Sequence, residues 1–300
     1  MRTVRIGTRD SMLALVQTEM VKKYIEEHSD TRVELVSMKT TGDIILDKPL
    51  DKIGGKGLFM KELDAALQDG RSDLSVHSLK DVPMELPEEF PLLGFSERAD
   101  CRDVLVLPQG VEALDLSKPV GCSSKRRMLQ FQRLYPDAVF KNVRGNVPTR
   151  LSKLDRGEYG ALILAAAGLK RLGLEGRISR YFEPEEMLPA AGQGIIAVQG
   201  SRDFDRTCLE GFFDRNAEAA AVAERAFVRY LNGGCSSPIA AHATVSGGFM
   251  KVYGLYYDEE ISQEYITGSI EGECSMAEEL GRKLARMLKD KLETQLGGRA

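Results

Sequence analysis

Seven basic side chains lie in short turns rich in glycine, serine and asparagine, although the chain as a whole is slightly acidic. They are Arg9, Lys56, Lys80, Arg126, Arg127, Arg144 and Arg150. The 300 residues include 41 Lys and Arg against 45 Asp and Glu, so general cationic attraction does not account for these positions. Guanidinium groups bind planar carboxylates and phosphates through paired hydrogen bonds. The pattern therefore predicts a site for one strongly anionic small ligand.

The basic turns follow predicted β-strands at 4–6, 74–76, 120–122 and 139–143. The residues after these strands are, in chain order, Arg9 and Ser11, then Ser78 and Lys80, then Ser123, Ser124, Arg126 and Arg127, then Arg144 and Gly145. Parallel α/β sheets bind ligands beyond the carboxyl ends of their strands, where helix N-termini present N–H groups to anions. A single arginine is equally well explained as solvated surface. The shared placement of the set favours one common site.

Asp81 is an acidic residue among these cations. A carboxylate gains nothing by facing an anionic ligand, so its position suggests proton transfer or contact with an N–H group. Nearby positive charge would keep it ionised, as a base or a partner for a developing cation requires. A helix cap, or simple neutralisation of Lys80, are the structural alternatives.

Cys235 lies in the sequence GGCSSP, where two glycines and Pro238 predict a tight loop. A free cysteine is more often a small buried hydrophobic residue than a nucleophile, so the loop alone leaves its role open. The five cysteines are widely spaced and form no CxxC pair, which argues against a disulfide framework or a zinc site. With three histidines and no HExxH spacing, no metal is predicted.

Two phosphate-binding motifs are excluded by their context. The GGKG segment at 54–57 lacks the GxxxxGKS/T spacing of a P-loop. Gly192, Gln193 and Gly194 precede an apolar run at 195–198, whereas a dinucleotide site needs the strand before its glycines. A nucleotide site is therefore not expected.

The first two-thirds of the chain alternate short β-branched runs with amphipathic helical stretches, in two sets that meet near residue 100. This predicts two α/β domains with mainly parallel sheets. The last third differs: a helix at 217–231 ends at Gly233 and Gly234, alternating runs follow, and a long helix closes the chain at 275–296. A small α+β domain is expected there.

The bulk composition limits the partners of the protein. A pI near 5.7 argues against nucleic acid as a partner. No apolar stretch approaches the roughly 18 residues of a membrane span, and residues 1–11 have no apolar leader segment. We expect a soluble cytoplasmic protein that has no membrane partner.

Eight motifs resemble the porphobilinogen deaminase (hydroxymethylbilane synthase) family, in family order and over nearly the whole chain. They are GTRDSMLALVQ (7–17), GGKGLFMKEL (54–63), HSLKDVP (77–83), SSKRR (123–127), RGNVPTRL (144–151), AAGLKRLG (166–173), LPAAGQG (188–194) and GGCSSPI (233–239). The resemblance implies an enzyme that joins four porphobilinogen units head to tail, with release of ammonia, into the linear tetrapyrrole hydroxymethylbilane. It also implies a dipyrromethane cofactor, held by a thioether to Cys235, and a catalytic role for Asp81.

The resemblance further implies which side chains bind the acetate and propionate arms of cofactor and substrate. They are Arg9, Ser11, Ser78, Lys80, Ser123, Ser124, Arg126, Arg127, Arg144, Gly145, Arg150, Arg171 and Gln193. Lys52, Lys56 and Phe59 match a mobile loop over the site. Lys125 departs from the usual apolar residue before the arginine pair, and we expect it to face solvent.

Family members have two periplasmic-binding-protein-like domains around a cleft and a third domain that carries the cysteine. The implied domains are 1–96 with 195–211, then 100–190, then 215–300. Nothing requires more than a monomer. A two-lobed protein that binds a polyanion without chemistry is the alternative, and it leaves Asp81 and Cys235 unexplained. A phosphotransferase is disfavoured because neither phosphate-binding context is present.

Overall fold

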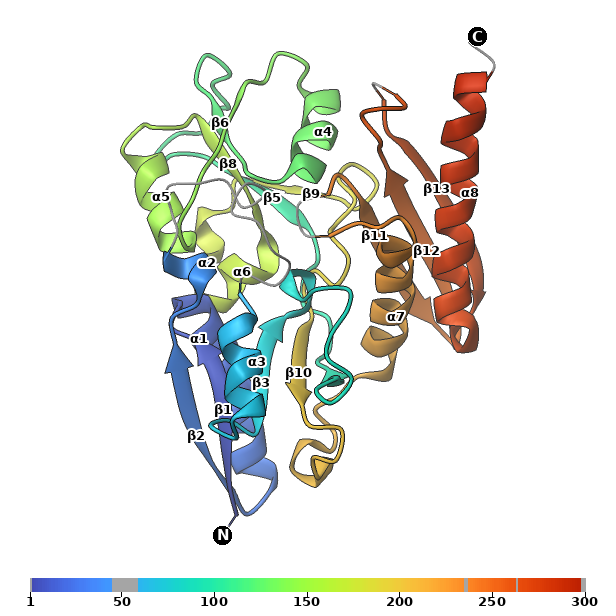
Figure 1. Cartoon of the computed structure of the whole chain (residues 1–300). Helices are drawn as coiled ribbons and strands as arrows, with labels where there is room; N and C mark the ends of the chain where they lie inside the picture. The colour runs from blue at the N-terminus through green and yellow to red at the C-terminus, as the bar shows by residue number, and fades with distance from the viewer. Residues whose placement is uncertain (1, 45–58, 235–236, 263, 298–300) are drawn as a thin grey trace.

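Two five-stranded sheets occupy the first two-thirds of the chain, and their strand orders correspond (Figure 1). The structure is a computed structural model that describes residues 2–44, 59–234, 237–262 and 264–297. In each sheet one strand runs against the other four. The predicted α/β class, with two mainly parallel sheets and a smaller C-terminal unit, is confirmed.

The first sheet has the order β2-β1-β3-β10-β4. Its strands are β1 (Arg2–Arg9), β2 (Thr31–Met38), β3 (Leu74–Ser78), β4 (Leu92–Phe95) and β10 (Ile196–Gly200). The reversed strand is β10, which pairs antiparallel with β3 and with β4. The chain therefore returns to the first sheet after building the second.

The second sheet has the order β7-β6-β8-β5-β9. Its strands are β5 (Asp103–Val106), β6 (Val120–Gly121), β7 (Phe140–Lys141), β8 (Ala161–Ala165) and β9 (Arg180–Phe182). Here β5 is the reversed strand, antiparallel to β8 and β9. The sequence analysis predicts neither β4 nor β9.

Five helices and one shorter helical turn accompany these sheets. They are α1 (Met12–His28), α2 (Thr41–Ile44), α3 (Lys61–Gln68), α4 (Lys125–Leu134), α5 (Val147–Asp155) and α6 (Ala166–Arg171). Ser11 caps α1, since its Oγ accepts the Ala14 N–H at 3.4 Å. Val21 and Ile25 then lie on one face of α1 and pack into the core of the first sheet.

The C-terminal unit is an antiparallel sheet of β11 (Ala240–Ser246), β12 (Phe249–Tyr256) and β13 (Ile266–Glu273). Helices α7 (Arg215–Tyr230) and α8 (Ala277–Gly297) cover one of its faces, with Phe227, Val252 and Leu284 fully buried between them.

The end of α7 also differs from the sequence expectation. The predicted glycine cap does not take the left-handed position, because Asn232 does so with φ of 52°. Gly233 then donates its N–H to the Val228 carbonyl at 2.9 Å, which closes the helix. Asparagine tolerates this conformation better than most residues, so it can replace glycine here.

Two segments, 96–102 and 183–195, connect the sheets, and each ends at a reversed strand. Ile196 pairs with Ser78, so the residues just before β10 lie at the carboxyl end of β3. Asp103 pairs with Ala165, so the first residue of β5 lies at the carboxyl end of β8. Both connections therefore bring side chains to the strand ends where the basic turns lie. The exact domain limits implied by the family resemblance stay a prediction.

Candidate functional site

Asp103 is the centre of a buried polar cluster that joins the two sheets. Its carboxylate is fully buried and accepts hydrogen bonds from Arg126 Nη1 at 2.6 Å, Arg127 Nε at 2.9 Å and Gln193 Nε2 at 2.9 Å. Burial by itself would raise the pKa of Asp103, but the two guanidinium charges outweigh it and hold that pKa well below its usual range. Asp103 therefore stays ionised as an internal counter-ion.

The two arginines bound to Asp103 are largely engaged by the protein. Arg126 Nη1 also donates to the Leu188 carbonyl at 2.7 Å, and Arg127 Nη1 to the Ile163 carbonyl at 3.1 Å. Both side chains are buried. Arginine forks held in this way keep a fixed geometry, with charge that exceeds the single carboxylate they share.

Lys80 lies next to this cluster, at the end of β3. Its Nζ is 3.5 Å from Gln193 Oε1, a long contact that leaves donors available. Burial of the amino group lowers the pKa of Lys80 to about 8. The Asp81 charge opposes that shift, and the Arg127 charge adds to it. The ammonium group therefore stays mainly protonated at pH 7 and loses its charge as the pH rises through about 8.

Asp81 ends a 3-10 turn, Leu79–Asp81, and its side chain is exposed. Within the described ranges its carboxylate makes no hydrogen bond or ion pair. Neither structural alternative is seen, because Asp81 caps no described helix and forms no ion pair with Lys80. Its charge nevertheless acts on Lys80, Arg127 and Arg150. Asp81 is thus an open carboxylate in a positive field.

Arg150 and Arg144 extend the positive field along the second sheet. Arg150 Nε donates to the Gly145 carbonyl at 2.8 Å, and Gly145 has φ of 113°, which favours glycine there. The two Nη atoms of Arg150 bond no described residue. Burial and then the Arg127 charge lower the pKa of Arg150 to about 10. Arg144 Nη2 lies 3.5 Å from the Gly42 carbonyl, which brings the two sheets together at this point.

Arg171 and Gln193 sit where the second connection enters β10. Arg171 Nη2 donates to the Gly194 carbonyl at 2.7 Å, while its buried Nε has no partner among the described residues. Burial lowers the pKa of Arg171 to about 10. A buried N–H without an acceptor is costly, so it marks a place where a ligand oxygen would be favourable.

Arg9 lies at the end of β1 and is held by a neighbouring acidic residue. Its Nε donates to Asp43 at 3.0 Å, its Nη2 bonds the other Asp43 oxygen, and its guanidinium lies 4.1 Å from the centre of the Phe59 ring. Phe59 is thus placed beside a predicted binding residue. Lys52 and Lys56, the other predicted loop residues, lie outside the described residues.

The predicted serines mainly hold the turns themselves. Ser11 caps α1, and Ser78 exchanges hydrogen bonds with Gln17 at 2.8 and 3.0 Å. Ser123 Oγ donates to the Val143 carbonyl at 2.7 Å, and Ser124 precedes α4 without a side-chain cap. Their roles toward a ligand stay a prediction.

Cys235 lies outside the described residues. On either side of it, Gly234 N–H donates to Ser237 Oγ at 2.9 Å, and Ser237 N–H donates to the Gly234 carbonyl at 3.1 Å. The described residues contain no group of three His, Cys, Asp or Glu side chains arranged to hold a metal. They also contain no helix with both the length and the apolar character to cross a membrane.

Asp103 is the site residue that sequence reasoning missed. An acidic residue that opens the apolar run at 104–107 is a signal, because an ionised group at a buried strand end needs cationic partners. Sequence reasoning also missed Glu224, which lies fully buried in α7 and accepts a hydrogen bond from Arg98 Nη2 at 2.8 Å. Both carboxylates link separate parts of the fold.

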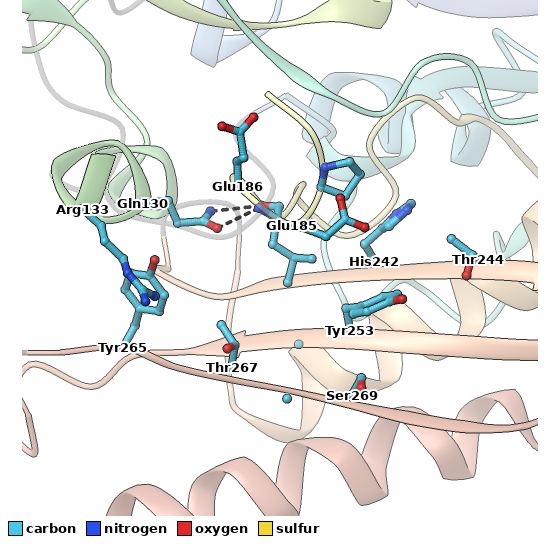
Figure 2. A pocket seen from close by; sticks show the side chains of 14 residues that line it. Gln130, Arg133, Glu185, Glu186, His242, Thr244, Tyr253, Tyr265, Thr267 and Ser269 are labelled. Atoms are coloured by element: carbon cyan, nitrogen blue, oxygen red, sulfur yellow. Dashed lines mark hydrogen bonds between the residues drawn. The ribbon is translucent and has the colours of Figure 1, made fainter. Parts of the chain in front are cut away.

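A pocket of about 330 Å³ lies between α4 and the C-terminal sheet (Figure 2). It is bounded by Gln130 and Arg133 of α4, by Glu185, and by Tyr253 and Tyr265 of the C-terminal unit. None of the predicted site residues lines it. The chemistry of the basic turns therefore does not coincide with this hollow.

Two family models match the chain. Residues 4–208 match "Porphobilinogen deaminase, dipyromethane cofactor binding domain", and residues 219–290 match "Porphobilinogen deaminase, C-terminal domain". The porphobilinogen deaminase of Alkaliphilus oremlandii is 53% identical over 287 residues, covering 95% of this chain and 96% of the relative. That of Acetivibrio thermocellus is 51% identical over 288 residues, covering 95% and 98%.

Among solved structures, similarity extends to the periplasmic VFT2 domain of Bordetella pertussis BvgS. The TM-score is 0.40 at 15% identity, covering 69% of this chain and 83% of that one. The aliphatic sulphonate binding protein SsuA of Escherichia coli gives a TM-score of 0.40 at 12% identity, covering 77% and 71%.

Proposed function

We propose that this chain, which belongs to the porphobilinogen deaminase family, condenses four porphobilinogen molecules head to tail into hydroxymethylbilane. Ammonia leaves at each step. The reaction makes the chain an enzyme of tetrapyrrole synthesis and, by class, a transferase.

One observation carries the proposal: an open carboxylate lies inside a field of only partly satisfied cations. Asp81 has no described partner, while Lys80 makes one long contact and Arg150 leaves both Nη atoms free of described partners. A site built only to capture a polyanion would have no use for an unpaired carboxylate. A condensation that creates positive charge on a carboxylate-bearing substrate needs both kinds of group.

The donor set suits a dipyrromethane, which bears acetate and propionate arms. The Nη atoms of Arg150 and the buried Nε of Arg171 offer hydrogen bonds that carboxylates would accept. Arg126, Arg127 and Lys80 would supply further positive charge, and Cys235 would hold the group through a thioether. When bound, the dipyrromethane supplies the pyrrole carbon to which new units are joined.

Asp81 performs the proton and charge work in this proposal. Its exposed carboxylate accepts hydrogen bonds from pyrrole N–H groups and stabilises the positive charge that develops as ammonia leaves and the next ring attacks. The surrounding cations orient the substrate by its acidic arms. Release of the ring proton completes each addition.

Intact-mass measurement under denaturing conditions tests the proposal. Protein expressed in a host that makes porphobilinogen should carry the extra mass of a dipyrromethane, and Cys235→Ala should lack it. Asp81→Ala should retain the added mass but lose about 10²- to 10⁴-fold in turnover. Unmodified, inactive wild-type protein would refute the deaminase and favour the alternative, a two-lobed polyanion-binding protein without catalysis.

We further propose that the enzyme is a cytoplasmic monomer. A reducing compartment would keep the Cys235 thiol free for its thioether. Light scattering on the holoenzyme and fractionation of the source cells test these two points; a stable dimer or a secreted form would contradict them.

A further inference from the structure

The backbone that carries Asp81 is held from three directions. Leu79 N–H donates to the Ile195 carbonyl at 3.0 Å, and Val82 N–H donates to the Leu79 carbonyl at 3.1 Å. On the far side of Asp81, Arg225 Nη1 donates to the Val82 carbonyl at 3.1 Å and Arg225 Nη2 to the Pro83 carbonyl at 2.6 Å. One guanidinium thus binds the carbonyls of the two residues that follow Asp81.

Arg225 belongs to α7, not to the sheet that carries Asp81. Helix α7 lies between the first sheet and the C-terminal sheet (Figure 1). Its Ala217 and Ala221 pack with Leu79 and Val82, the residues on either side of the Lys80–Asp81 pair. The same helix leads in sequence to Cys235. It therefore contacts the Asp81 turn and precedes the predicted cofactor anchor.

The setting of Arg225 is unusual for a residue that only fills space. Its side chain is buried, and among the described residues it pairs with no carboxylate. The buried charge is therefore stabilised only by hydrogen bonds to backbone carbonyls. A neutral or apolar residue would avoid that cost. What the guanidinium adds is a planar fork with two fixed donors, which sets the orientation of consecutive carbonyls.

We propose that Arg225 is a positioning residue for Asp81, which fixes the direction of its carboxylate by clamping the Val82 and Pro83 carbonyls to α7. The proposal rests on the catalytic role proposed for Asp81. Arg225 touches neither substrate nor cofactor in this scheme. It ties the aspartate to the helix that precedes Cys235 in the sequence.

Arg225→Met tests the clamp, because methionine keeps an apolar stem and removes both donors. We expect kcat to fall about 10- to 100-fold, as for a catalytic group displaced by about 1 Å, with an unchanged KM for porphobilinogen and an unchanged covalent mass. Arg225→Lys, with a single point donor, should restore part of the loss. Arg229→Met is the matched control: Arg229 is exposed one turn later, and it contacts the Met84 carbonyl at 3.4 Å and Glu278 at 3.7 Å but neither the Val82 nor the Pro83 carbonyl.

A double-mutant comparison separates positioning from a general loss of structure. In an Asp81→Glu background, where the carboxylate is already displaced, Arg225→Met should cost clearly less than in the wild type. Equal fold losses in both backgrounds, or an unchanged kcat in Arg225→Met, would overturn the proposal. A rise in KM matching the fall in kcat/KM would also overturn it.

Hydrogen exchange gives a readout that does not depend on turnover. The Leu79 and Val82 amides should exchange faster in Arg225→Met than in Arg229→Met, because the clamp on the turn is gone. Equal exchange would show that Arg225 does not hold the turn. A wild-type protein without covalent mass or ammonia release would instead refute the proposed function, and the exchange result would still decide whether the clamp exists.

Discussion

Two aspartates share one field of cations and are used in opposite ways. Asp103 is fully buried and accepts three side-chain hydrogen bonds, from Arg126, Arg127 and Gln193. Asp81 is exposed and has no described partner, although it acts on Arg127 as well. A carboxylate saturated with donors cannot take part in chemistry, whereas an open one can.

The difference shows how the protein can concentrate arginines without an anionic ligand. Buried guanidinium groups need compensation, and Asp103 provides it inside the protein. Cations further out, at Arg150 and Lys80, keep donors that a ligand would satisfy. The inner carboxylate therefore supports the fold, and the outer one is left for the reaction.

Asp103→Ala should have the largest effect on stability. It leaves two buried arginines without a counter-ion, so we expect a loss of about 3–5 kcal/mol in the free energy of unfolding. Urea denaturation measures this, with Asp81→Ala as the control that should unfold like the wild type. Equal midpoints for Asp103→Ala and the wild type would contradict the role given to Asp103.

The same contrast predicts acid sensitivity. Because the pKa of Asp103 is lowered in the folded protein, its contribution is present above the unfolded value of about 3.9 and is lost as pH falls below it. Asp103→Asn should flatten the acid side of the stability curve. Between pH 6 and pH 2 the melting temperature of the variant should therefore fall by ~4 °C less than that of the wild type.

Arg126→Leu and Arg150→Leu should separate the cations that stabilise the fold from those that bind the ligand. Arg126→Leu removes hydrogen bonds to a buried carboxylate and should cost about 1.5–3 kcal/mol of unfolding free energy. Arg150→Leu should leave stability within about 1 kcal/mol while weakening substrate or cofactor binding by about 10- to 100-fold. Denaturation and KM measured on the same preparations check both variants. A stability loss in Arg150→Leu together with weaker binding alone in Arg126→Leu would exchange the two roles.

Lys80 should give substrate binding a dependence on pH. Burial lowers its pKa to about 8, so the ammonium loses its charge as pH rises through that value and carboxylates bind less tightly. We expect KM to rise by up to about tenfold per pH unit above 8. Lys80→Arg, which stays charged, should remove that slope; an identical slope in the variant would assign it to another group.

Lys125→Ala should have the smallest effect. Lys125 is exposed at the start of α4, next to the buried Arg126. Stability should change by no more than about 0.5 kcal/mol and turnover by less than about twofold. A larger fall in turnover would place Lys125 in the binding field.

Sequence reasoning located the basic turns because local signals mark them. Arg9, Lys80, Arg126 and Arg144 each lie at the end of a strand of the sheets or shortly after it. It could not locate Asp103 or Arg225, since their partners are distant in sequence: Asp103 meets Gln193, and Arg225 meets Val82 and Pro83. It also could not show the direction of β5 and β10, because an apolar run reads the same whichever way a strand runs.

The return of the chain to the first sheet through β10 sets an order for folding. Among the described strands, β4 pairs with β10 alone, so the first sheet cannot be completed until residue 200 is available. All strands of the second sheet lie between residues 103 and 182. During synthesis from the N-terminus the second sheet can thus close while the first, begun earlier, still has an unpaired β3 edge. Since such edges are prone to aggregation, the ribosome-bound chain is most vulnerable before β10 emerges.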